Sequence, residues 1–203
     1  MSDTPTVTEL QLVAGHPALD FTNTASWPRG EVGNERLTDY AALLLWSART
    51  GLIDAAQADA MRTRSLAQPE EATRVLHRAR DLRGAVHGVF AARATGALVR
   101  RRALDQLNHH LAEALPHARI REHHGVFDWI WEGTPDALDR MLWPLARSAA
   151  DLLTSVELAR VRVCAGETCG WLFIDTSKNR TRRWCSMSDC GNRAKVRRFR
   201  ARR

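Results

Sequence analysis

Apolar residues recur every three or four positions through most of the first 160 residues, and this spacing predicts α-helices with one buried face. One stripe follows Pro69 and two acidic residues, a combination typical of a helix N-terminus. Its members are Val75, Leu76, Ala79, Leu82, Val86, Val89 and Phe90. The sequence therefore predicts one long helix across residues 69–96.

A second stripe follows Thr134 and Pro135, which predict an N-cap and a first helical position. Its apolar members are Leu138, Met141, Leu142, Leu145, Leu152, Leu153 and Val156. Because Pro144 lies inside this stripe, we expect a kink there.

Three shorter patterns complete the helical part. Residues 38–49 predict a helix that ends at Gly51. Asp54 and Gln57 have the spacing of a capping box and predict the start of the next helix. A further helix is marked by evenly spaced leucines, namely Leu104, Leu107, Leu111 and Leu115.

Only residues 117–133 alternate between apolar and polar side chains, which predicts a β-hairpin with a turn at His124 and Gly125. The expected fold class is thus mainly α, with one small hairpin on a helical domain.

The charge distribution divides the chain near Arg160. The formal net charge is +7, yet residues 1–159 carry 17 Arg against 20 Asp and Glu. Residues 160–203 carry 13 Lys and Arg against three acids. We therefore expect a helical domain at residues 1–159 and a small basic segment at 160–203 whose partner is a polyanion.

All four cysteines fall in the basic segment, as two pairs of C-x4-C spacing: Cys164, Cys169, Cys185 and Cys190. A disulfide pair would need an oxidising compartment, and iron–sulfur clusters usually have other spacings. Two thiolate pairs suit a tetrahedral zinc site. Zinc is also physically needed, because so short a segment cannot bury a sufficient core. Four protein ligands leave no open coordination position, so the predicted metal is structural.

The rest of this segment predicts a short strand at residues 171–174, a polar loop at 176–183 and a basic helix from about residue 193. Val196 and Phe199 are three residues apart and are expected to face the zinc module. The candidate nucleic-acid contacts are Asn179, Arg180, Arg182, Arg183, Asn192, Arg193, Lys195, Arg197, Arg198 and Arg200. Basic side chains neutralise phosphates, and Arg or Asn can read base edges. The alternative is a frayed basic tail that only aids solubility.

Residues 190–193 read CGNR and follow three further cysteines, which resembles the CGNR zinc finger family. In that family the finger closes a bacterial protein at its C-terminus. The preceding part resembles the ABATE domain, through LDFTNT at residues 19–24 and ERLTDYAALLLWSARTGLI from Glu35. Together the two resemblances cover nearly the whole chain. They imply a stress-responsive transcription regulator whose zinc finger binds DNA.

The stretch HPALDFTNTASWPRG places Asp20 and Asn23 among apolar residues, and Arg36 follows the loop. A domain joined to a DNA-binding module often senses a ligand. Our hypothesis is that these three residues help form a polar network or a small effector pocket, and the favoured alternative is a capping or structural network that fixes the loop.

Other functional classes find less support. Phosphate loops and the H-E-x-x-H and G-x-S-x-G motifs are absent, so we expect no enzyme. Without a leader or an apolar run long enough for a membrane span, a soluble cytoplasmic protein is expected. DNA is the expected partner, and the helical domain could form a homodimer. RNA is the alternative if Trp171, Phe173 and Trp184 are exposed for base stacking, and an acidic protein partner is another.

Overall fold

The computed structural model describes residues 6–201, so Arg202 and Arg203 of the basic segment lie outside the described residues. Within this range the chain forms seven α-helices and four short strands. The helices are α1 Pro17–Thr22, α2 Tyr40–Arg49, α3 Ala55–Ala67, α4 Pro69–Thr95, α5 Arg101–Ala114, α6 Leu142–Leu153 and α7 Asn192–Arg200. The strands are β1 Ala118–His123, β2 Val126–Trp131, β3 Val161–Val163 and β4 Leu172–Ile174. The fold is mainly α, as predicted.

The predicted helix boundaries are largely confirmed by their capping contacts. Asp39 accepts a 2.8 Å hydrogen bond from the amide of Ala42 at the start of α2. Asp54 and Gln57 form the expected capping box of α3. Helix α4 starts at Pro69 and ends at Gly96, which adopts a left-handed conformation.

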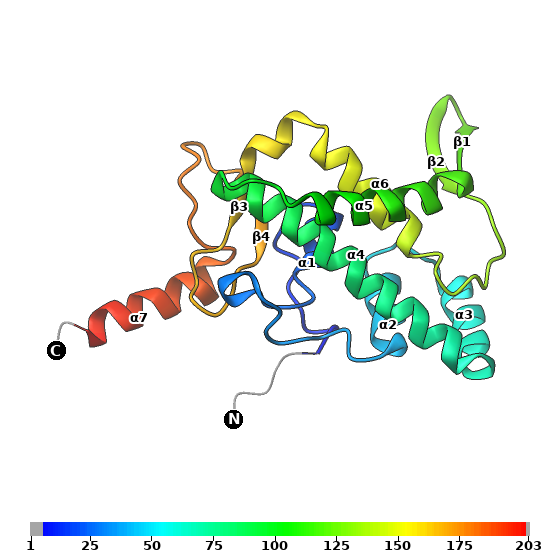
Figure 1. Cartoon of the computed structure of the whole chain (residues 1–203), viewed down its shortest axis with the longest axis horizontal. Coiled ribbons are helices and arrows are strands. Elements are labelled where there is room, and N and C mark those ends of the chain that lie inside the picture. Colours follow the sequence, from blue (N-terminus) through cyan, green and yellow to red (C-terminus); the bar gives the residue numbers. More distant parts are fainter. Residues whose placement is uncertain (1–5, 202–203) are drawn as a thin grey trace.

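Helix α4 organises the core (Figure 1), because it contacts α1, α2, α3, α5 and α6 as well as β3 and β4. Its apolar stripe is buried, as the sequence predicts. Two polar side chains, Arg83 and His87, are buried beside that stripe. Among residues 6–201, no helix combines the length and the apolar character needed to cross a membrane.

The predicted helix over residues 134–156 is wrong at both ends. Residues 134–141 form turns, and α6 begins at Leu142. Pro144 therefore lies in the first helical turn, where its missing N–H costs no intrahelical hydrogen bond, and the expected interior kink does not arise. Val156, which was expected on the apolar face, lies beyond the helix and is 92% exposed.

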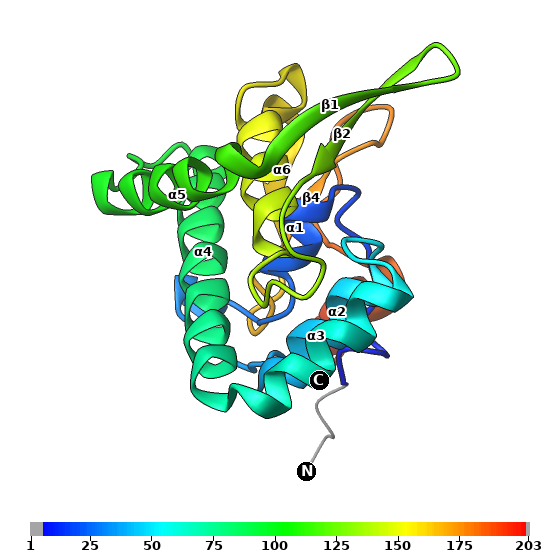
Figure 2. The same cartoon turned by 90° about the vertical axis from the view of Figure 1, so that its right-hand side faces the viewer.

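The predicted hairpin is confirmed. Strands β1 and β2 are antiparallel, with Ile120 opposite Trp129. The turn residues His124 and Gly125 have φ values of 52° and 78°, the conformation that a two-residue hairpin turn requires. Figure 2 shows the hairpin extending away from the helical body.

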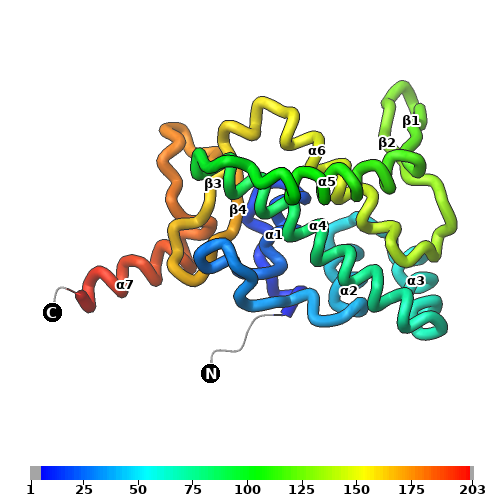
Figure 3. Tube along the Cα trace, viewed as in Figure 1, coloured from blue at the N-terminus to red at the C-terminus, as the bar shows by residue number. Residues whose placement is uncertain are grey.

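A second sheet joins the basic segment to the helical domain; its strand β4 confirms the strand predicted at residues 171–174, whereas β3 was not predicted. Strand β3 pairs antiparallel with β4, and the side chains of Val161, Leu172 and Ile174 belong to the main hydrophobic core. In the Cα trace, the loop that follows α1 lies against this sheet (Figure 3), and Trp171 donates a hydrogen bond to the Ala25 carbonyl at 2.8 Å. The change of charge near Arg160 therefore marks no break in packing.

Candidate metal centre and nucleic-acid interface

The four cysteines converge on one buried point. Cys164 follows β3, and Cys169 precedes β4. Cys185 lies just before the π-helical turn at Met187–Gly191, and Cys190 lies within that turn. Their Sγ atoms all lie within 4.8 Å of one another. Cys185 Sγ is 3.7 Å from Cys169 Sγ and 3.7 Å from Cys190 Sγ.

These separations fit a tetrahedral metal ion. Zinc–sulfur bonds of about 2.3 Å place neighbouring sulfurs about 3.8 Å apart, whereas a disulfide requires about 2.05 Å. Gly166 lies close to the sulfurs, since a Cβ there would be 3.3 Å from Cys190 Sγ. Arg193 donates to the same sulfur at 3.2 Å, so a cation offsets part of the thiolate charge.

The helical domain holds the backbone of the first cysteine pair. The Trp27 amide donates to the Cys169 carbonyl at 2.7 Å. Gly170 adopts a left-handed conformation against Trp27, where any Cβ would lie 2.2 Å from the Trp27 carbonyl oxygen. His87 Nε2 lies 3.2 Å from the Gly170 carbonyl oxygen. A side chain at residue 170 would therefore separate the finger from the helical domain.

Asn23 joins the two parts of the chain directly. Its Nδ2 donates to the Leu172 carbonyl at 2.9 Å, and its Oδ1 accepts from the Leu172 amide at 3.0 Å. The side chain is buried, so it acts as an extra pairing partner for β4. The guanidinium carbon of Arg36 lies 5.6 Å from the centre of the Trp171 ring. Both residues thus contact the finger, and effector binding by Asp20, Asn23 and Arg36 stays a prediction.

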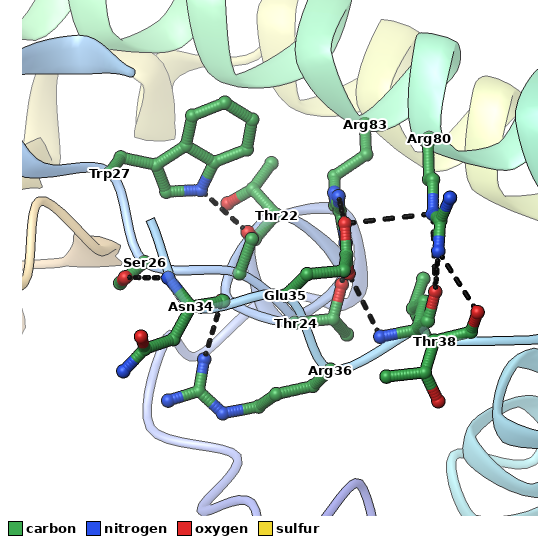
Figure 4. Close-up of polar contacts among 12 residues, drawn as sticks. Thr22, Thr24, Ser26, Trp27, Asn34, Glu35, Arg36, Thr38, Arg80 and Arg83 are labelled. Carbon is green, nitrogen blue, oxygen red and sulfur yellow. Dashed lines mark hydrogen bonds and ion pairs between the residues drawn. The ribbon is translucent and has the colours of Figure 1, made fainter. Parts of the chain in front are cut away.

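A buried ion pair supports the loop that carries Trp27 (Figure 4). Arg83 is 1% exposed, and it donates to Glu35 at 2.6 Å and to Thr24 Oγ1 at 3.0 Å. Burial alone would raise the pKa of Glu35, but the hydrogen bonds and charge of Arg83 lower it. Arg80 also donates to the Leu37 carbonyl, at 2.6 Å. The pairing fixes the loop after α1 against α4.

The ring of Trp27 completes this contact. It stacks on His87 with ring centres 3.9 Å apart, and its Nε1 donates to the Thr22 carbonyl at 2.8 Å. Burial lowers the pKa of His87 to about 4, so the imidazole is neutral at neutral pH. Sequence reasoning missed Trp27, Arg83 and His87 as residues that position the finger. The available signal was the pair of polar residues within the apolar stripe of α4.

Asp20 is buried in α1, where its Oδ1 accepts from the Ala14 amide at 3.1 Å. Burial raises the pKa of Asp20 from 3.8 to about 6, although hydrogen bonds from the backbone of Ala14 and Val13 lower it in part. A raised carboxyl pKa means that the folded state binds the proton more tightly than the unfolded state. Stability is therefore lost as the pH rises from about 4 to about 6.

We expect Asp20→Asn to remove this pH-dependent loss, because the amide stays neutral. Relative to the unchanged protein, the variant should gain up to about 3 kcal/mol of unfolding free energy between pH 4 and pH 7. Denaturant unfolding at both pH values measures the gain. Asp81→Asn, on the exposed face of α4, is the control and should show no such change. A difference that is equal at both pH values would contradict the role of Asp20 ionisation.

Three of the ten candidate contact residues are held within the finger. Arg182 donates to the Trp184 carbonyl at 2.9 Å and lies over the Phe173 ring. Arg193 pairs with Asp189 at 3.2 Å, beside its contact with Cys190. Arg197 pairs with Glu167 at 2.9 Å, and this pair ties α7 to the first cysteine turn.

The remaining candidates are exposed, namely Asn179, Arg180, Arg183, Asn192, Lys195, Arg198 and Arg200. Within residues 6–201, Lys195, Arg198 and Arg200 form no ion pair. Val196 and Phe199 are 47% and 61% exposed on α7, so neither is buried against the zinc module.

Three of the four aromatic residues of the finger are buried or partly buried, and the fourth, Phe199, is 61% exposed. Phe173 is fully buried, and Trp184 packs against the cysteine cluster. Trp171 is partly buried by its contacts with Ala25 and Arg36. Phe173 is therefore closed to base stacking of the kind that recognition of single-stranded RNA requires, and Trp171 and Trp184 are only partly accessible.

Comparisons with known proteins agree with this architecture. Residues 15–156 match the ABATE family model, which is described as "Putative stress-induced transcription regulator". Residues 160–203 match the CGNR zinc finger model. No curated protein matches the chain. The match to the finger and the geometry of the four sulfurs identify the cysteine cluster as a zinc site. The chain belongs to the ABATE family and ends in a CGNR zinc finger.

Proposed function

We propose that this protein is a transcription regulator that binds duplex DNA through its zinc finger. The observation that carries the proposal is the projection of α7 from the metal centre (Figure 1). The helix presents Lys195, Arg198 and Arg200 without intramolecular ion pairs among the described residues. Cationic side chains on a rigid helix suit phosphates and the major groove.

DNA is a better match than RNA for this surface. The finger offers basic groups on a helix and a loop, while Trp171, Phe173 and Trp184 pack against the zinc site and the helical domain; Phe199 is its one largely exposed aromatic side chain. Arg180 and Arg183 in the loop at residues 176–183 add two further exposed cations to the finger. A surface of this kind recognises phosphate positions and groove edges, whereas recognition of single-stranded RNA relies on stacking.

The zinc ion supports this function without taking part in chemistry. Four thiolate ligands fill a tetrahedral site and leave no position for a substrate, so the proposed role is structural. Cysteines held as thiolates suit a reducing compartment, and we place the protein in the cytoplasm. The proposed activity is binding rather than catalysis.

Selection of sequences from a random duplex library, with the zinc-loaded chain and with the chelated chain, tests the proposal. We expect the zinc-loaded chain to enrich a common DNA site and the chelated chain to enrich none. If the selected sequences share no common site, the proposal of sequence-specific DNA binding is contradicted. Preferential capture of single-stranded RNA in a parallel competition would favour the alternative partner.

Arg198→Gln is expected to weaken binding to duplex DNA and to reduce the dependence of log K on log salt by about 1, because one phosphate contact is lost. Fluorescence anisotropy at several salt concentrations measures both quantities. Arg101→Gln, at the exposed start of α5, is the matched control and should leave both unchanged. An unaltered salt slope in Arg198→Gln would remove this residue from the interface.

Arg193→Gln should give a different result from Arg198→Gln. Arg193 contacts Cys190 Sγ and Asp189, so its loss should speed zinc release to a chromogenic chelator. In Arg198→Gln the rate of zinc release should be unchanged. Equal zinc release from both variants would contradict this division of roles.

The helical domain, residues 15–156 of which match the ABATE model, is the proposed sensing part of the regulator. Asn23 and Arg36 touch the finger, so a ligand that displaced either residue would alter the support of β4 or Trp171. Titration of a candidate effector against Asn23→Ala would show whether that contact transmits the response.

A further inference from the structure

The β1–β2 hairpin carries an exposed apolar face. Ile120 and Trp129 lie opposite each other, and Phe127 is two residues from Trp129 on the same side of the sheet. Their exposures are 64%, 49% and 71%. One side of the Trp129 ring is covered by Arg147 of α6, whose guanidinium carbon lies 3.9 Å from the ring centre. The hairpin is thus attached to the body, but most of its apolar face is open.

The outer edge of β2 carries unpaired backbone groups at Phe127 and Trp129, whereas the Trp131 carbonyl accepts a hydrogen bond from Arg140. The Glu132 amide donates to the His117 carbonyl at 2.7 Å, which makes these residues a hydrogen-bonded pair. Antiparallel strands alternate between hydrogen-bonded and non-hydrogen-bonded pairs, so Trp129 and Phe127 belong to the second kind. Their N–H and C=O groups therefore point away from β1. In the described part of the chain, no third strand pairs with this edge.

The two edges of the hairpin differ in charge. Strand β1 contains Arg119, Arg121 and Glu122, and such charges protect an edge from pairing with another chain. Strand β2 reads VFDWIW and contains one charged residue, Asp128, which lies opposite Arg121. The two strands together contain two Arg, one Glu and one Asp, so their formal charges balance. The hairpin therefore does not attract a polyanion. An apolar edge with unpaired N–H and C=O groups matches another strand of the same kind.

We propose that β2 pairs with β2 of a second copy of this chain and forms a continuous four-stranded antiparallel sheet. Two identical edges related by a two-fold axis are self-complementary, because each offers both donors and acceptors. The pairing would join the apolar faces around Phe127 and Trp129 of both copies. It would also cover a two-stranded hairpin, which is marginally stable when it stands alone in water.

The position of the hairpin agrees with a dimer. It lies at the opposite end of the long axis from α7 (Figure 1), so the pairing leaves both basic helices uncovered. A contact along one six-residue strand is small, and we expect a dissociation constant in the micromolar range. The inference concerns assembly and is independent of the proposed DNA binding.

Sedimentation velocity of the full zinc-loaded chain without DNA, from about 1 to 300 µM, tests the proposal over the range of a weak interface. The unchanged chain should show a reversible monomer–dimer equilibrium. Phe127→Pro removes an outward N–H that the hairpin does not use, and Phe127→Lys places a charge on the apolar face. Each variant should raise the dissociation constant at least about tenfold, because a two-fold interface contains the change twice.

Leu98→Lys, at a residue that is 95% exposed between α4 and α5, is the matched control and should dimerise like the unchanged chain. Circular dichroism verifies that the variants are folded. If Phe127→Pro disturbs the hairpin, Phe127→Lys still decides the outcome. A monomer throughout the concentration range would overturn the proposal and leave the hairpin to a different protein. Unaltered dimerisation of Phe127→Lys would place the interface elsewhere.

Discussion

Removal of zinc is expected to abolish binding to duplex DNA and to unfold the two cysteine turns and α7, while β4 stays packed in the main core. The four sulfurs lie within 4.8 Å of one another, and without a metal nothing favours gathering four buried thiols. Structural zinc contributes on the order of 10 kcal/mol to folding in isolated fingers. Because α7 follows Cys190 directly through the π-helical turn, its orientation depends on that ligand. Helices α2 to α6 should persist, since most of their hydrophobic core is formed by residues that precede Cys164.

Cys185→Ser tests the same point without a chelator. Cys185 is fully buried and contacts two other sulfurs, so its loss should lower zinc content, melting temperature and DNA affinity together. Ser188→Ala, on an exposed residue of the same turn, is the control. Elemental analysis, circular dichroism and anisotropy with duplex DNA give the three readouts. A metal-free chain with full DNA affinity would show that the basic residues act without the finger.

Asn23→Ala is expected to lower the free energy of unfolding by about 3–5 kcal/mol, because it leaves both the N–H and the C=O of Leu172 buried without partners. The loss should also speed zinc release, since β4 follows directly from Cys169. Denaturant unfolding and transfer of zinc to a chromogenic chelator measure the two effects.

Asn34→Ala is the matched control, because Asn34 lies in the same loop with an exposed side chain (Figure 4). It should alter neither stability nor zinc release. A lower melting temperature in Asn23→Ala with unchanged zinc release would show that Asn23 stabilises the helical domain alone.

Local signals in the sequence were sufficient for much of the fold. The capping box of Asp54 and Gln57, the left-handed Gly51 after α2 and the turn at His124 and Gly125 each depend on neighbouring residues, so their physics is visible in a short stretch. The cysteine spacing predicted the metal centre for the same reason: the required ligands are few and chemically distinctive.

Long-range pairing was beyond local patterns. Strand β3 is three residues long and is defined by its partner β4. The link from Asn23 to Leu172 spans 149 positions of sequence. The start of α6 was misplaced because Thr134 and Pro135 carry a valid start signal, yet tertiary packing begins the helix at Leu142. The local sequence alone does not show whether the start signal at Thr134 and Pro135 or the packing of the folded chain determines where the helix begins.

The close approach of Gly170 to Trp27 restricts how this finger can be used elsewhere. A peptide that begins at residue 160 would lack the indole, the asparagine amide and the apolar side chains against which its own first turn is built. Grafting the finger onto a foreign protein would therefore require the loop after α1 to be transferred with it. Chimeras that exchange both segments together should retain metal, whereas those that exchange the C-terminal segment alone should lose it.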